Sequence, residues 1–220
     1  MQAQVHDAAA AAHRLASLGL AADDFEFVLR GADAEARMWS RAAPPVMAGM
    51  ARWGKTNELL RIRLLPRGWS QDNPQNLPRT ISPGGDFAIV GTAGDGATGW
   101  APGNPTTRYA KGVETARFIE RNGQLAFDYG GLSAAGTLPW RMGPADGAAT
   151  WLLLYNVTDS QIYAELSLPE SISPTGYVDA WTERVILPVT ELASPAASGR
   201  AARSGVAVDL AVERRGRRTG

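Results

Sequence analysis

Three carboxylates in the C-terminal half of the chain have the residue types and spacing for acid–base or metal chemistry. Glu165 lies on the less apolar face of a predicted strand at 162–168, and Asp179 and Glu183 share one face of a second predicted strand at 177–187. A hairpin that brought Glu165 beside either of the other acids would create a carboxylate pair. Such a pair can hold Mg²⁺ or divide the roles of acid and base.

The arrangement of these acids resembles that of nucleases of the restriction-endonuclease-like class, which carry an acid on one strand and a Glu-any-Lys motif on the next. Here the second motif would be Glu165-Leu166-Ser167, which lacks the Lys that stabilises the attacked phosphate. The resemblance implies a metal-dependent hydrolase or nuclease that uses Mg²⁺. The competing interpretation, which we favour, is a cross-strand salt bridge between Arg184 and one of the acids.

A second group of candidates immediately precedes a predicted helix at 113–121. Thr107, Arg108 and Lys111 place a hydroxyl group and two cations beside the free amides of a helix N-terminus, an arrangement that binds anions. The alternative is ordinary capping by a Thr, with both cations solvated. The Gly-rich segment 91–99 follows a predicted strand but does not open a helix, as a dinucleotide-binding or phosphate-binding loop must.

Basic residues also gather near the end of a predicted N-terminal helix. Arg61, Arg63 and Arg67 lie between Trp53 and Trp69. Cations interleaved with stacking aromatic rings are typical of a nucleic-acid-binding surface. The alternative is a solvated basic face that contacts no ligand.

The exposure of Trp53 helps to distinguish a nucleic-acid-binding surface from a solvated basic face. A base-stacking role needs an exposed ring, whereas Val46, Met50 and Trp53 recur at helical spacing. That spacing predicts a single apolar stripe on the helix, so the sequence favours a buried Trp53.

The composition excludes several other classes of function. The 22 basic residues balance the 22 acidic ones, so no overall field steers the protein toward nucleic acid or a membrane surface. There is no Cys, and the two His residues lie about two helical turns apart, which excludes a zinc site built from these residue types.

Apolar runs are shorter than the roughly 20 residues that span a bilayer, and no signal peptide is visible. The abundance of Arg, Ala, Gly and Pro is typical of a GC-rich bacterial genome. We therefore expect a soluble, cytoplasmic bacterial protein with no membrane partner.

The elements that must position these residues follow from periodicity and turn signals. Apolar spacing predicts helices in the N-terminal part, at 6–19, at 23–30, from Asp33 to the Pro44-Pro45 pair, and from there to residue 65. Apolar or alternating runs predict strands at 86–92, 124–129, 151–157, 162–168, 177–187 and 206–213. The Pro-rich stretch 66–85 predicts a long connection without regular structure.

These elements predict an α+β fold in which an N-terminal helical layer packs on a mainly antiparallel sheet. We expect one domain, with the helical layer at 1–65, the sheet-containing portion at 66–220 and a mobile segment at 191–205. Two functional hypotheses remain open. The first is a noncatalytic binding or accessory protein without a cofactor, whose partner is nucleic acid or another protein. The second is the Mg²⁺-dependent hydrolase.

Overall fold

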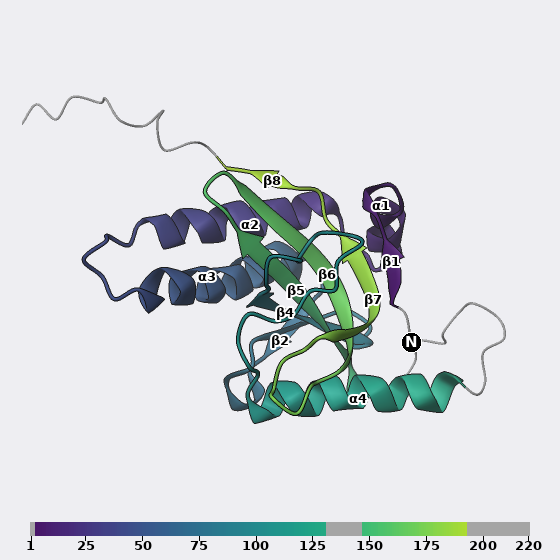
Figure 1. Cartoon of the computed structure of the whole chain (residues 1–220). Helices are drawn as coiled ribbons and strands as arrows, with labels where there is room; N and C mark the ends of the chain where they lie inside the picture. Colours follow the sequence, from purple (N-terminus) through teal and green to yellow (C-terminus); the bar gives the residue numbers. More distant parts are fainter. Residues whose placement is uncertain (1–2, 131–146, 193–220) are drawn as a thin grey trace, which may run out of the picture.

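The computed structural model describes residues 3–130 and 147–192 of the chain, and Figure 1 shows them as a sheet with helices on both faces. The strands are β1 Gln4–His6, β2 Ser70–Asp72, β3 Arg79–Ile81, β4 Phe87–Ala93, β5 Ala149–Val157, β6 Gln161–Ser171, β7 Ala180–Ile186 and β8 Thr190–Glu191. The α-helices are α1 Ala8–Ser17, α2 Ala22–Arg37, α3 Val46–Leu64 and α4 Val113–Gly130. Two short 3₁₀ turns lie at Leu65–Arg67 and Pro74–Asn76.

The sheet has eight strands in the order β1-β7-β6-β5-β4-β3-β2, with β8 paired to β6. Its neighbours are antiparallel except at two places, where β1 runs parallel to β7 and β4 runs parallel to β5. The α+β architecture and the mainly antiparallel sheet are therefore confirmed, although the sheet is mixed. The β4–α4–β5 crossover matters most for the site, because it places the carboxyl ends of two parallel strands side by side.

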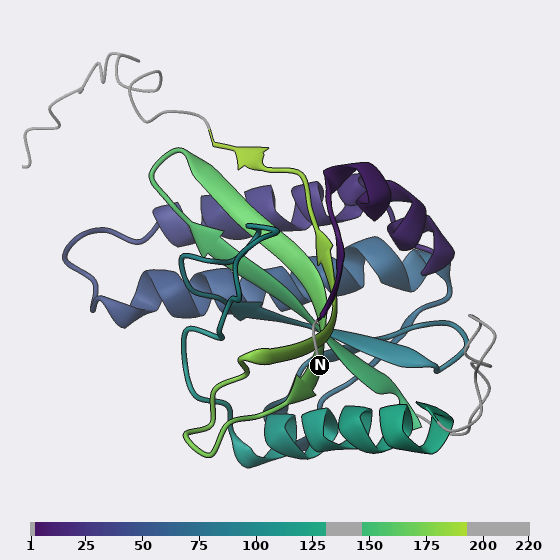
Figure 2. The same cartoon turned by 45° about the vertical axis from the view of Figure 1, so that its right-hand side comes forward.

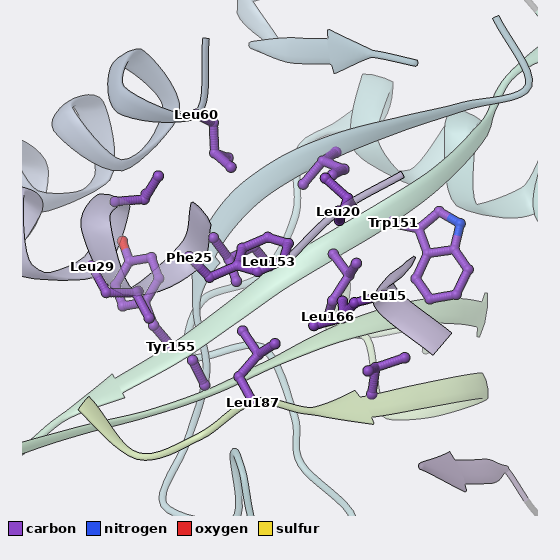
Figure 3. Close-up of a cluster of buried hydrophobic side chains, with 14 of the residues drawn as sticks. Leu15, Leu20, Phe25, Leu29, Leu60, Trp151, Leu153, Tyr155, Leu166 and Leu187 are labelled. Atoms are coloured by element: carbon purple, nitrogen blue, oxygen red, sulfur yellow. The ribbon is translucent and has the colours of Figure 1, made fainter. Parts of the chain in front are cut away.

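The main hydrophobic core lies between the sheet and helices α1 to α3 (Figure 3). Alternate residues of β5 separate the two faces of the sheet, since Trp151 and Leu153 point into this core while Leu152 and Leu154 point toward α4. All four side chains are buried, and each such burial contributes about 1.5–3 kcal/mol. Figure 2 shows α4 on the opposite side of the sheet from α2 and α3.

Helix α2 is longer than predicted. The expected break between 23–30 and a further helix from Asp33 is wrong, because α2 runs without interruption through Gly31. A Cβ atom at Gly31 would come within 2.5 Å of the Leu59 side chain in α3. Gly31 thus allows α2 and α3 to approach closely, a tertiary reason that local helix propensity does not register.

Helix α4 is also longer than predicted. The expected stop before Asn122 and the strand at 124–129 are both wrong, because α4 continues to Gly130. The Asn122 side chain is buried, and its amide donates to the Thr150 carbonyl and accepts from the Thr150 amide, both at 2.9 Å. Asn122 therefore anchors the helix to the sheet instead of ending it.

The stretch 66–85 contains more regular structure than expected, because β2 and β3 form a short antiparallel hairpin within it. The helix expected at 6–19 begins later, at Ala8, because residues 4–6 form strand β1, which pairs with β7 far away in the sequence. The predicted strand at 206–213 and most of the segment 191–205 lie outside the described residues. No described helix has both the length and the apolarity needed to cross a membrane.

Candidate ligand-binding cleft

Glu165 forms a fully buried ion pair with Arg184 across β6 and β7. Arg184 Nε donates to Glu165 Oε1 at 2.9 Å and Nη2 donates to Oε2 at 2.6 Å. The same carboxylate accepts the Gly99 amide at 2.9 Å and the Ser167 hydroxyl at 2.8 Å. With four donors around it and no exposed surface, the carboxylate has no oxygen left for a metal ion.

The other two acids do not join Glu165. Glu183 turns toward α1 and β1. Arg14 Nη2 of α1 donates to Glu183 Oε2 at 2.9 Å, and His6 Nε2 of β1 lies 2.9 Å from Glu183 Oε1. In the regular β6–β7 register Ser167 pairs with Arg184 and Leu168 pairs with Glu183, so Glu183 lies on the opposite face of the sheet from Glu165. Asp179 precedes β7, and the prediction that the strand includes it is wrong. Within residues 3–122 and 147–192, no three acidic or His side chains are grouped to hold a metal ion, so these carboxylates do not fit Mg²⁺.

The basic residues near the end of α3 are held by groups of the protein itself. Arg63 Nε and Arg67 Nη1 donate to the two oxygens of buried Asp24 at 2.8 and 2.7 Å. Arg61 Nη2 donates to the Asp72 carbonyl at 2.9 Å. Burial raises the pKa of Asp24, but the hydrogen bonds from Arg67 and Arg63 outweigh it and leave the pKa below its ordinary value. These cations join α2, α3 and the β2–β3 hairpin.

The predicted burial of Trp53 is wrong. Trp53 is 42% exposed, and Val46 and Met50 are 58% and 59% exposed. The first half of α3 extends past the strands together with the end of α2 (Figure 1), so the stripe shared by these residues faces no sheet. Only the second half of α3, from Thr56 onward, is buried.

Two adjoining cavities open where this exposed half of α3 passes the carboxyl ends of β4 and β5. The larger one has a volume of about 620 Å³ and lies between α3, the strand ends and residues 108–111. The smaller one, of about 440 Å³, continues toward residues 75–78 and the start of α4. Trp53, Thr92 and Lys111 line both cavities, and we call the combined space the cleft.

The larger cavity combines positive charge with aromatic surface. Among the described residues, its lining includes three cations, Arg52, Arg108 and Lys111, and no Asp or Glu. Trp53 and Tyr109 supply aromatic walls, and Tyr109 is 64% exposed. Positive groups beside flat apolar rings suit an anion that carries an apolar or aromatic part.

The segment that carries Arg108 is tied to the sheet at two points. Thr107 is fully buried, and its amide donates to the Val178 carbonyl at 3.0 Å while its hydroxyl accepts the Val178 amide at 3.2 Å. The Arg108 amide donates to the carbonyl of Ala93, the last residue of β4, at 2.9 Å. Thr107 therefore positions the segment rather than facing a ligand. The Arg108 side chain, by contrast, has no hydrogen bond or ion pair with any described residue and is free to meet an anion.

Lys111 lies where the two cavities meet. Its Nζ donates to the Thr92 hydroxyl at 2.7 Å, and its backbone amide donates to the Gly176 carbonyl at 2.7 Å. Burial lowers the pKa of Lys111 to about 8, because desolvation disfavours the charged amine. The predicted pair Arg108 and Lys111 is thus brought to one cleft.

Sequence reasoning missed Arg52 and Tyr155 as members of this cleft. Arg52 Nη2 donates to buried Asp33 at 2.8 Å, and its Nε is buried with no partner in the described part of the chain. Burial raises the pKa of Tyr155 to about 12, against a smaller opposing effect of Arg52, so the phenol stays protonated at neutral pH. Recognising β4 and β5 as parallel neighbours would have pointed to their carboxyl ends.

The first turn of α4 contributes backbone groups to the smaller cavity. Residues 112–115 line it, and the first amides of a helix have no partner within the helix. The only carboxylate among the described lining residues, Glu114, has an oxygen 3.6 Å from Arg117 Nη1. Of the predicted cations, Lys111 lines this smaller cavity, whereas Arg108 lines only the larger one.

The comparisons with known proteins identify no relative, since no family model, curated protein or solved structure matches this chain.

Proposed function

We propose that the protein is a noncatalytic binding protein whose cleft takes an anionic ligand with an apolar or aromatic part. The observation that carries this proposal is the larger cavity, in which three cations and no described acid face aromatic walls. The unpaired Arg108 side chain is the group best placed to meet the negative charge. A cytoplasmic bacterial location is part of the proposal, and the absence of Cys is compatible with it.

Nucleic-acid binding through Arg61, Arg63 and Arg67 has less support. Their guanidinium groups already donate to Asp24 and to the backbone carbonyls of Gly19 and Asp72, so binding phosphate would require breaking intramolecular bonds. A hydrolase centred on Glu165 also has less support, because Arg184 occupies that carboxylate. In the larger cavity of the cleft, by contrast, the Arg108 side chain is unpaired among the described residues and lies beside exposed rings.

Calorimetric titration with pyridoxine 5′-phosphate, and with uncharged pyridoxine as its matched control, tests the proposal. We expect the phosphate to bind more tightly and its affinity to fall with added salt. Arg108→Ala should weaken phosphate binding about tenfold, because a charge-assisted hydrogen bond contributes about 1.5–3 kcal/mol and this side chain is partly hydrated.

Arg30→Ala is the control variant, because Arg30 is exposed on α2 and neither it nor its partner Glu26 lines either cavity. Equal affinity for pyridoxine and its phosphate, or equal losses in Arg108→Ala and Arg30→Ala, would contradict the proposal. If a single-stranded oligonucleotide bound through Arg61, Arg63 and Arg67 while the cleft variant had no effect, the basic cluster of α3 would be the site instead.

A further inference from the structure

We infer that Lys111 captures its ligand covalently, by forming a reversible imine with an aldehyde or 2-oxo group of the anion held in the cleft. The inference rests on the proposed function and names a ligand class for it, namely small anionic carbonyl compounds. Lys111 would be the residue that bonds to the ligand and Arg108 the residue that holds its negative charge.

The environment of Lys111 differs from that of an ordinary half-buried lysine. A buried ammonium is normally paired with a carboxylate, because an uncompensated buried charge is costly. The side-chain bond of Lys111 goes instead to the neutral hydroxyl of Thr92. The larger cavity adds Arg52 and Arg108 and, among its described lining residues, no acid. Desolvation favours the neutral amine, which is the nucleophile.

Lys111 is also placed where a ligand can reach it. It lines both cavities, so its amine borders the space in which an anion would lie beside Arg108. With a pKa near 8, about half of the amine is neutral at that pH, against well under 1% for an ordinary lysine. The two cavities give a ligand access to the Lys111 amine, and burial increases the neutral fraction of that amine, which is the reactive form.

The chemistry needs no further reagent. The nitrogen lone pair attacks the carbonyl carbon and forms a C–N bond as the C=O π pair moves to oxygen, and one N–H proton transfers to that oxygen to give a neutral carbinolamine. The hydroxyl group then takes up the second N–H proton and leaves as water as the C–O bond breaks, while the electron pair left on nitrogen forms the C=N bond. Hydrolysis reverses both steps. The Thr92 hydroxyl, 2.7 Å from Nζ, is the nearest group able to exchange hydrogen bonds with the forming carbinolamine.

The chain provides its own internal control, because Lys55 and Lys111 are its only lysines. Lys55 lies on α3, lines neither cavity, and pairs with Glu58 at 3.0 Å. The full chain is treated with limiting pyridoxal 5′-phosphate near pH 8, and the imine is reduced with sodium cyanoborohydride. Peptide mass spectrometry then compares the labelling of Lys55, Lys111 and the N-terminal amine.

We expect Lys111 to be labelled at least about tenfold faster than Lys55, since its larger neutral fraction outweighs its lower intrinsic basicity. The preference should fall with uncharged pyridoxal and in Arg108→Ala, and it should persist in Arg30→Ala. Lys111→Arg, with an unchanged melting temperature, should lose the preferential label, while the labelling of Lys55 and of the N-terminal amine stays as in the wild type.

Equal labelling of the two lysines would overturn the inference. If pyridoxine 5′-phosphate binds the cleft and Lys111 is still not preferred, the imine is overturned and the proposed function stands. If pyridoxine 5′-phosphate does not bind and Lys111 is not labelled preferentially, both the imine and the proposed function are overturned. A preference for Lys111 that is as strong with pyridoxal as with its phosphate would overturn the assignment to anionic carbonyl compounds.

Discussion

The Glu165–Arg184 pair provides the sharpest test of how the sheet is held together. Glu165→Ala removes a carboxylate with no exposed surface and leaves Arg184, which is 2% exposed, without its counter-charge. It also removes the acceptor of the Gly99 amide and of the Ser167 hydroxyl. Breaking a buried ion pair from one side costs about 3–5 kcal/mol, because the remaining charge is uncompensated.

The expected loss is large compared with the stability of an ordinary domain. A free energy of unfolding of about 5–15 kcal/mol is typical, so a loss of 3–5 kcal/mol removes a substantial part of it. For a chain of this length the melting temperature falls by about 2–4 °C for each kcal/mol of unfolding free energy that is lost. The expected fall is therefore about 6–20 °C. Glu165→Gln keeps the shape and one acceptor oxygen, and should fall between the wild type and Glu165→Ala.

Urea unfolding followed by tryptophan fluorescence, with thermal melting alongside, measures these losses. Glu26→Ala is the control, since it breaks an exposed pair with Arg30 one helical turn away and should cost about 0.3–0.5 kcal/mol. A Glu165→Ala protein as stable as Glu26→Ala would refute the structural role of the pair. Increased stability would point to a carboxylate reserved for a ligand, as the hydrolase hypothesis requires.

Two further predictions concern the attachment of the helical layer. Asn57→Leu should cost about 2–4 kcal/mol in urea unfolding, because the buried Asn57 amide satisfies both the N–H and the C=O of Gly91; a cost near zero would mean that water replaces the amide without penalty. Stability should fall as the pH drops below the ordinary Asp24 value of 3.8 and through its lower folded-state pKa, since a depressed carboxyl pKa stabilises the fold only above that range. In Arg63→Ala combined with Arg67→Ala the folded-state pKa of Asp24 rises, because burial then acts without these two hydrogen bonds. The acid-dependent loss should therefore shrink when unfolding is measured between about pH 2 and 6, and an unchanged profile would contradict the assignment.

The sequence predicts the centre of the sheet well and its periphery poorly, for a physical reason. Strands β4, β5 and β6 carry apolar runs whose burial is encoded locally. Strand β1 is extended only because β7 lies beside it, and local propensity contains no information about that neighbour. Helix α2 likewise passes through Gly31 because Leu59 packs there.

In the candidate site, too, residues that follow a local sequence pattern could be predicted, and contacts between distant residues could not. Arg108 and Lys111 could be found from the sequence, because cations before a helix N-terminus are a local pattern. The partners of Arg63 and Arg67 could not, since Asp24 lies about forty residues away. Helical periodicity correctly placed Val46, Met50 and Trp53 on one face, but it does not reveal where the sheet ends and whether that face is covered.

The buried ion pair and the cleft are connected through the segment between β4 and α4. Near its start, the Gly99 amide donates to Glu165, and Arg184 Nη1 donates to the Gly103 carbonyl at 2.5 Å. Further along, backbone bonds to β4 and to the stretch before β7 fix the residues at and just before Arg108. A loop of this length would pay a large entropic cost to hold a side chain in one place. Tying it to the sheet at both ends offsets that cost before any ligand arrives, so Glu165 acts on the cleft as an anchor for the loop that carries its cations.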